Sequence, residues 1–108
     1  MSYYLLQLAY TPEAWSALLR SPQNRQQAVG PALAKLGGKL DQSWFSFGDY
    51  DLVGILNLPD NVSAAAFSLA VSAGGAVKAI KTTPLMTLEE GIQAMEKAAT
   101  CGYRPPGK

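Results

Sequence analysis

The side chains that could support binding or acid–base chemistry in this chain form a short list. The chain has no histidine and a single cysteine, which excludes Ser-His-Asp and Cys-His nucleophiles and histidine-based metal sites. A carboxylate and a lysine beside an apolar pocket could act as a base and an anion anchor, although structural or solvated roles are commoner for such residues. The candidate ligand-binding residues are Gln7, Trp44, Tyr50, Asp51, Lys78 and Lys81.

Three of these candidates belong to a predicted hairpin within residues 44–57. The pair Gly48-Asp49 is typical of a two-residue type II′ turn, because glycine takes a positive φ at no steric cost. Such a turn fixes the register and places Ser46 opposite Asp51. The Asp51 carboxylate could accept a hydrogen bond from the serine hydroxyl, although we expect the pair simply to close the hairpin. One face of the hairpin would be a core face, carrying Phe45, Phe47, Tyr50, Leu52 and Leu56. The other would carry Gln42, Trp44, Ser46, Asp51, Val53 and Ile55.

The rest of the chain alternates strand and helix patterns. In residues 3–10 the side chains at odd positions and those at even positions are both largely apolar. This pattern predicts a strand that is buried on both faces. Thr11-Pro12 and Ser21-Pro22 each combine a helix cap with a proline, so we expect two helical segments before Gly37. Further signals predict a helix from 62 to about 73 and a strand over 76–83. A capping box at 87–90 opens a last helix that ends near 100.

This order is β-α-β-β-α-β with an added C-terminal helix, an α+β arrangement of the split βαβ kind. We expect one domain over 1–108, with a core at 3–86, a helix at 88–100 and a tail at 101–108. The tyrosines of the first strand are expected in the core or at an interface. Arg20 and Arg25 flank the helix break and are expected to face solvent.

Three short motifs carry a family resemblance. Gly48-Asp49-Tyr50-Asp51 is preceded by Leu36-Gly37-Gly38-Lys39 and followed by Asn57-Leu58-Pro59-Asp60. In this order and spacing, the chain resembles the GYD domain family from about residue 3 to about residue 90. The resemblance implies a ferredoxin-like fold, with a four-stranded antiparallel sheet, helices on one face, and an assembly of the dimeric α/β barrel type. It makes Gly48, Asp49, Tyr50 and Asp51 a structural motif and implies no assigned activity.

The composition points to a partner chain of the same kind. Hydrophobic residues make up 48% and charged residues only 16%, which is low for a small soluble monomer. We therefore expect a homodimer or a higher even-numbered oligomer. A net charge of +1 without a basic cluster argues against nucleic acid as a partner.

Other sequence features limit where the protein can be located and which cofactors it can hold. The N-terminus lacks a signal-peptide pattern, and the longest uncharged run, residues 61–77, is too short and too weakly apolar to span a membrane. We therefore expect a cytoplasmic protein without a membrane partner. The glycine pairs at 37–38 and 74–75 lack the spacing of nucleotide-binding loops, so neither a cofactor nor a metal is predicted.

Three functions remain open at this stage. The preferred one is a homo-oligomeric module that binds a small apolar metabolite in a pocket near the sheet interface. An alternative is a cofactor-independent enzyme, an isomerase or a monooxygenase, of the dimeric α/β barrel kind. The third is a protein whose surfaces serve only self-assembly. Whether the chain is an enzyme stays undecided.

Overall fold

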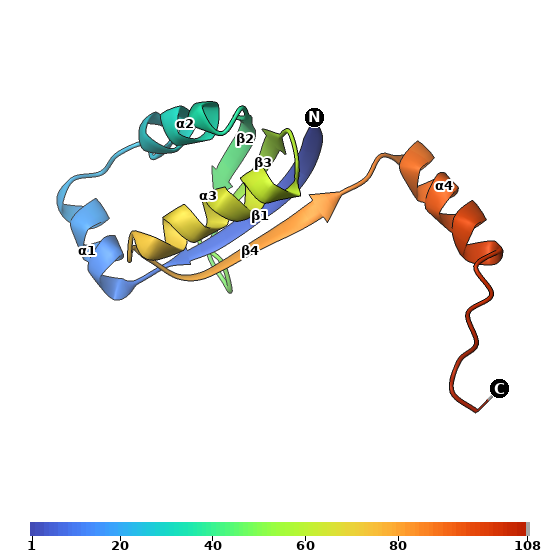
Figure 1. Ribbon diagram of the computed structural model, residues 1–108. Coiled ribbons are helices and arrows are strands. Elements are labelled where there is room, and N and C mark those ends of the chain that lie inside the picture. Colours follow the sequence, from blue (N-terminus) through green and yellow to red (C-terminus); the bar gives the residue numbers. More distant parts are fainter. Residues whose placement is uncertain (108) are drawn as a thin grey trace.

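The computed structural model describes residues 1–107, so Lys108, the last residue of the predicted tail, lies outside the described residues. Figure 1 shows the expected order of elements, with the first helical region in two parts as predicted. The elements are β1 (Ser2–Tyr10), α1 (Pro12–Arg20), α2 (Gln26–Lys35), β2 (Lys39–Phe45), β3 (Leu52–Leu58), α3 (Asn61–Ala73), β4 (Val77–Leu85) and α4 (Leu88–Ala99).

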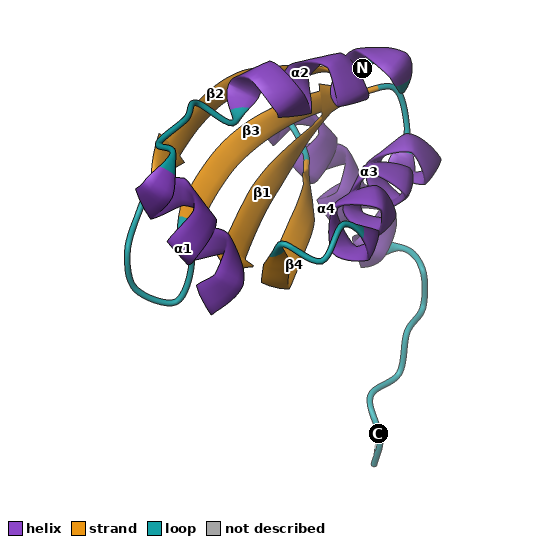
Figure 2. Ribbon diagram, turned by 90° about the vertical axis from the view of Figure 1, so that its left-hand side faces the viewer, coloured by secondary structure: helices purple, strands orange, loops and turns teal. Residues whose placement is uncertain are grey.

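The four strands form one antiparallel sheet in the order β2-β3-β1-β4. This order confirms the ferredoxin-like arrangement, in which the first and third strands lie at the centre. Figure 2 shows the curved sheet beside α2 and α3, with α1 at the end of β1. Strands β1 and β3 therefore provide the central platform on which the helices pack.

The core lies between this platform and the helices. Alternate residues of β1 and β3 point toward α2 and α3, because side chains in a strand alternate between the two faces. The fully buried cluster joins β1, β3, α2 and α3 and includes Tyr4, Leu6, Leu33, Leu56, Leu58 and Phe67. Burying each large side chain of this kind stabilises the fold by roughly 1.5–3 kcal/mol.

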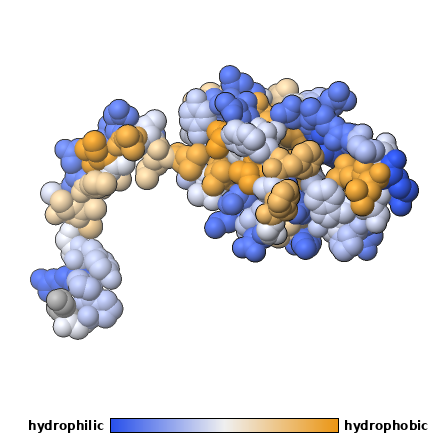
Figure 3. All heavy atoms as spheres, turned by 180° about the vertical axis from the view of Figure 1, so that it is seen from behind, coloured by the Kyte–Doolittle hydropathy of each residue, from blue (hydrophilic) through white to orange (hydrophobic). Residues whose placement is uncertain are grey.

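The opposite face of the sheet has no helix over it. Tyr3, Trp44 and Leu85 are exposed there, Trp44 to 53%, and Leu5 and Ile55 are partly buried. Figure 3 shows the molecule from behind, with apolar atoms on the body beside the projecting arm and along the arm itself. The apolar character predicted for both faces of the first strand is present, and one of these faces is open to solvent in the single chain.

The hairpin keeps the predicted register but has a longer loop. Phe45 pairs with Leu52, as a two-residue turn requires. Yet β2 ends at Phe45 and β3 begins at Leu52, so residues 46–51 form the connection. Gly48 has the expected positive φ of 137°. The placement of Phe47 on the core face is wrong, since its side chain is 99% exposed at the loop tip.

Helix α4 leaves the body of the protein. It begins with the predicted capping box, in which Thr87 and Glu90 exchange hydrogen bonds of 2.9 and 3.1 Å. None of its residues is buried, and Leu88, Ile92 and Met95 form an exposed apolar stripe. Figure 1 shows the helix as an arm beyond the end of β4. A helix with an apolar stripe needs a surface to pack against, and α4 finds none on the described part of its own chain.

The two glycines between α2 and β2 are each required for a different structural reason. Gly37 has a φ of 81°, which suits the residue after a helix end. Gly38 lies so close to β3 that an added Cβ would meet the carbonyl oxygen of Asn57 and the side chain of Leu58. The motif Leu36-Gly37-Gly38-Lys39 is thus explained by a turn and a close backbone approach.

We predict that Gly38→Ala lowers the free energy of unfolding by about 2 kcal/mol, the usual cost of forcing extra atoms into a packed site. Gly91→Ala, inside α4, is the control. A Cβ at Gly91 meets nothing within 4 Å, so alanine should leave the free energy of unfolding unchanged or raise it by up to about 1 kcal/mol. Urea denaturation of both variants measures the difference, and equal stabilities would contradict the close approach of Gly38 to β3.

Candidate functional site

The six candidate residues fall in separate places. Strand pairing places Trp44, Val53, Gln7 and Lys81 in one row across the open face of the sheet, since each is the register partner of the next. Gln7 and Trp44 therefore share a face with Lys81, as a site on the open sheet would require. Lys78 lies beside the register shift at the start of β4. Tyr50 and Asp51 belong to the loop between β2 and β3.

Asp51 joins three parts of the chain. Its Oδ2 accepts hydrogen bonds from the backbone N–H of Tyr10, at 2.9 Å, and from Nε1 of Trp15, at 3.2 Å. Its own N–H donates to the carbonyl of Leu8 at 2.8 Å. The carboxylate thus connects the hairpin loop to the end of β1 and to α1.

The hydrogen bond considered possible between the Ser46 and Asp51 side chains is not formed, and the pair closes the hairpin loop through the backbone instead. The Ser46 hydroxyl donates to the carbonyl of Tyr50, at 2.8 Å, and the Ser46 N–H donates to the carbonyl of Asp51 at the same distance. The reason is competition, because the Asp51 carboxylate is held by donors from β1 and α1. Serine then closes the loop through the backbone.

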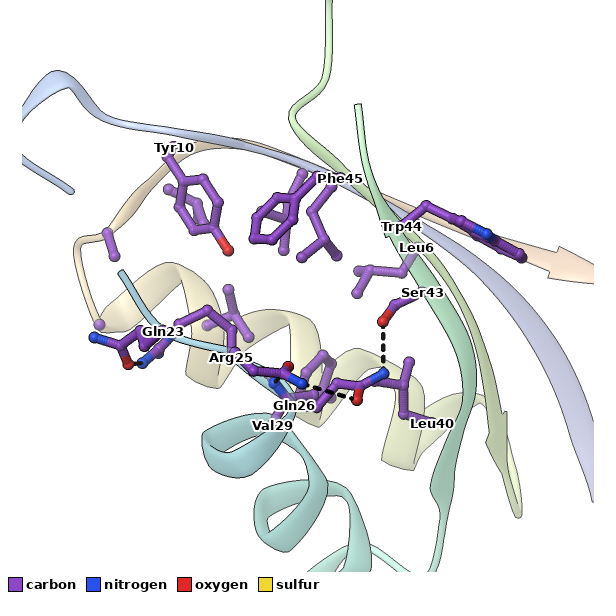
Figure 4. A pocket seen from close by; sticks show the side chains of 18 of the residues that line it. Leu6, Tyr10, Gln23, Arg25, Gln26, Val29, Leu40, Ser43, Trp44 and Phe45 are labelled. Carbon is purple, nitrogen blue, oxygen red and sulfur yellow. Dashed lines mark hydrogen bonds between the residues drawn. The ribbon is translucent and has the colours of Figure 1, made fainter. Parts of the chain in front are cut away.

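Tyr10 and Trp15 form an aromatic pair beside this carboxylate. Their ring centroids are 5.3 Å apart and the rings are inclined by 79°, an edge-to-face arrangement that is favoured for aromatic side chains. With its backbone held by Asp51 and its ring held by Trp15, Tyr10 has a fixed orientation. Tyr10 is 6% exposed, and its hydroxyl points into a cavity (Figure 4).

That cavity lies on the helix side of the sheet. It has a volume of about 910 Å³ and lies between the sheet, α2, α3 and the connection from α1 to α2. Apolar side chains from the sheet and both helices form most of its wall, among them Leu6, Leu8, Val29, Phe45, Leu52, Phe67 and Val71. Phe45 is exposed in the single chain because its side chain lines this open cavity.

Polar groups gather at one side of the cavity, on residues 23–26. Figure 4 shows Gln26 donating to the hydroxyl of Ser43, at 2.9 Å, which ties the start of α2 to β2. Nη1 of Arg25 donates to the side chain of Gln23 at 3.0 Å. Asn24 accepts the Gln26 N–H at 2.9 Å. The cavity therefore combines an apolar wall with a polar edge that carries one positive charge.

The electrostatics of the cavity centre on Tyr10. Burial raises the pKa of its hydroxyl above the ordinary 10.0, the nearby Arg25 guanidinium lowers it, and the Asp51 carboxylate raises it. Because the net direction is upward, the hydroxyl is protonated at neutral pH. It can therefore donate a hydrogen bond to a molecule in the cavity.

Of the six candidate residues, Trp44 alone is among those that line the cavity, and its ring points away from it in Figure 4. Tyr10 and Arg25 both line the cavity. From the sequence, Tyr10 was expected in the core or at an interface, and Arg25 was expected to face solvent. No sequence signal distinguished them, because their common location depends on how the α1–α2 connection folds over the end of β1.

Within residues 1–107 there is no group of three or more His, Cys, Asp or Glu side chains that could hold a metal ion. None of the helices in the described part of the chain is both long and apolar enough to cross a membrane.

Comparisons with known proteins agree with the fold. A family model described as the GYD domain matches residues 4–95. A search of solved structures matched the crystal structure of TTHA0845 from Thermus thermophilus, with a TM-score of 0.52. The two chains are 19% identical, and the match covers 81% of this chain and 95% of that one. At this identity the likeness shows the fold alone. A search of curated proteins gave no match.

We predict that Asp51→Ala destabilises the protein by about 2–3 kcal/mol, because two donors lose their acceptor in a partly buried place. Asp49→Ala is the control, since Asp49 is exposed in the same loop. Urea denaturation followed by tryptophan fluorescence measures both effects. If the two variants were equally stable, the carboxylate would not hold β1 and α1 together.

Proposed function

The chain belongs to the GYD domain family, and on this basis we propose that it is a homo-oligomeric module that binds a small apolar molecule. The observation that carries this proposal is the cavity of about 910 Å³ on the helix side of the sheet. Binding sites for small molecules are typically concave spaces of about 300–1,000 Å³, mostly apolar, with a few polar groups. The cavity has this size and this distribution of groups.

The arrangement favours binding over turnover. Asp51 already accepts two hydrogen bonds, from Tyr10 and Trp15, and Lys78 and Lys81 are not among the residues that line the cavity. The carboxylate–lysine pair that would support acid–base catalysis is therefore not assembled there. Our proposal locates the molecule between the sheet and the helices, rather than on the open sheet face where Gln7, Trp44 and Lys81 lie.

Assembly is the second part of the proposal. The open sheet face presents Tyr3, Trp44 and Leu85, and α4 presents its apolar stripe, both without a covering element within residues 1–107. Exposed apolar side chains that gather on one surface are typical of association surfaces. We propose that a second copy covers the open face, sheet against sheet as in dimeric α/β barrels, giving a dimer or a higher even-numbered oligomer. The free, exposed Cys101 supports a reducing location such as the cytoplasm.

We predict that the protein purified from its own host carries reproducible extra mass in native mass spectrometry. Val71→Trp should lose this mass, because Val71 lines the cavity and a larger side chain would fill it. Val62→Trp lies on the same helix at an exposed position and should retain the mass. Absence of extra mass in the wild-type protein, or its persistence in Val71→Trp, would count against the cavity as the binding site.

We also predict that Trp44→Glu shifts the oligomer toward monomer, because a carboxylate would be buried between two apolar sheet faces without a partner. Phe47→Glu is the control, since Phe47 is exposed at the loop tip. Light scattering after size-exclusion chromatography measures the mass of each variant. An oligomer unchanged by Trp44→Glu would rule out the sheet face as its interface.

A further inference from the structure

We propose that the molecule bound in the cavity is an apolar monocarboxylate, with its carboxylate held by the Arg25 guanidinium and the Tyr10 hydroxyl. This inference rests on the proposed binding function and adds the chemical class of the ligand. It follows from the charge at the polar edge of the cavity, from the orientation of Tyr10 and from the apolar remainder of the wall.

Arg25 supplies a positive charge without a negative partner. It is partly buried at the start of α2. Its guanidinium donates a hydrogen bond to the neutral side chain of Gln23, and it also interacts with the neutral hydroxyl of Tyr10. Within residues 1–107 the one ion pair joins Lys39 and Asp41, at 3.9 Å. A partly desolvated guanidinium gains most from a bound anion, and its planar fork suits a carboxylate.

The rest of the lining provides no acid that could neutralise this charge. Among the described residues that line the cavity, Arg25 is the only charged one. The carboxylate that influences Tyr10 is that of Asp51, which faces the Tyr10 backbone and the Trp15 ring nitrogen. The cavity is therefore electrostatically suited to a negative group and unsuited to a cationic ligand.

Tyr10 adds a second contact of the right kind. Its hydroxyl points into the cavity from the end of β1, on the side opposite α2, and Arg25 approaches from the start of α2 (Figure 4). The influence of Arg25 on the Tyr10 pKa places the two groups within electrostatic reach of each other. A carboxylate between them would accept hydrogen bonds from both side chains.

The cavity wall beyond Tyr10 and Arg25 determines which chemical character the rest of the ligand must have. Leu6, Leu8, Leu52 and Phe67 form an apolar surface beyond the polar edge. A hydrocarbon chain or an aromatic ring placed there loses contact with water, at a gain of about 0.8 kcal/mol for each buried methylene. One anionic group on an apolar body matches this division of the cavity.

Isothermal titration calorimetry with decanoate and 1-decanol tests the inference, since the two probes share a chain and differ in charge. We expect the wild-type oligomer to bind decanoate about ten-fold more tightly than decanol, the effect of a charge-assisted contact. Arg25→Gln should remove this preference, because it should weaken decanoate binding far more than decanol binding. Arg20→Gln, at an exposed position on α1, should keep the preference, and Tyr10→Phe should reduce it.

The outcomes separate this inference from the proposed function. Equal affinity of the wild-type protein for both probes, or a preference that survives Arg25→Gln, would overturn the carboxylate while leaving apolar binding in place. Failure of the wild-type protein to bind either probe would overturn both. A far-UV circular dichroism spectrum that matches that of the wild type shows that the Arg25→Gln variant is folded.

Discussion

The hydrogen bonds accepted by the Asp51 carboxylate are the constraint on which the candidate site depends. They join the end of β1 to α1 and to the hairpin loop, and through Trp15 they fix the ring of Tyr10. Donors that lose such an acceptor in a partly buried place leave a desolvation cost uncompensated. The geometry of the cavity wall therefore depends on a residue that does not itself line the cavity.

The sheet has two different roles on its two faces. The face under α2 and α3 supplies the core and the apolar wall of the cavity. The open face supplies the row Trp44, Val53, Gln7 and Lys81, which suits contact with a second copy. Helix α4 adds a further apolar stripe outside the body. The proposed binding and the proposed assembly therefore use different sides of the same four strands.

Several parts of the fold were predictable because they depend on local chemistry. The capping box at Thr87 and the glycine pair at 37–38 mark helix ends wherever the chain lies in space. The turn expected at Gly48-Asp49 correctly predicted the pairing of Phe45 with Leu52, although the loop is longer than two residues. The exposure of Phe47 was not predictable, because strict alternation assumes that both strands continue to the turn. Asp51 ends this alternation by turning toward β1.

The amino-acid sequence alone specified the order of strands and helices, the ferredoxin-like sheet and the apolar character of both sheet faces, since these follow from periodicity, caps and a family motif. The three-dimensional packing settled which side carries the cavity, and that Tyr10 and Arg25 meet there while Lys78 and Lys81 do not line it. The physical reason is distance along the chain. Tyr10 and Arg25 are brought together by the packing of α1 and α2 over the end of β1, and no local pattern records that packing.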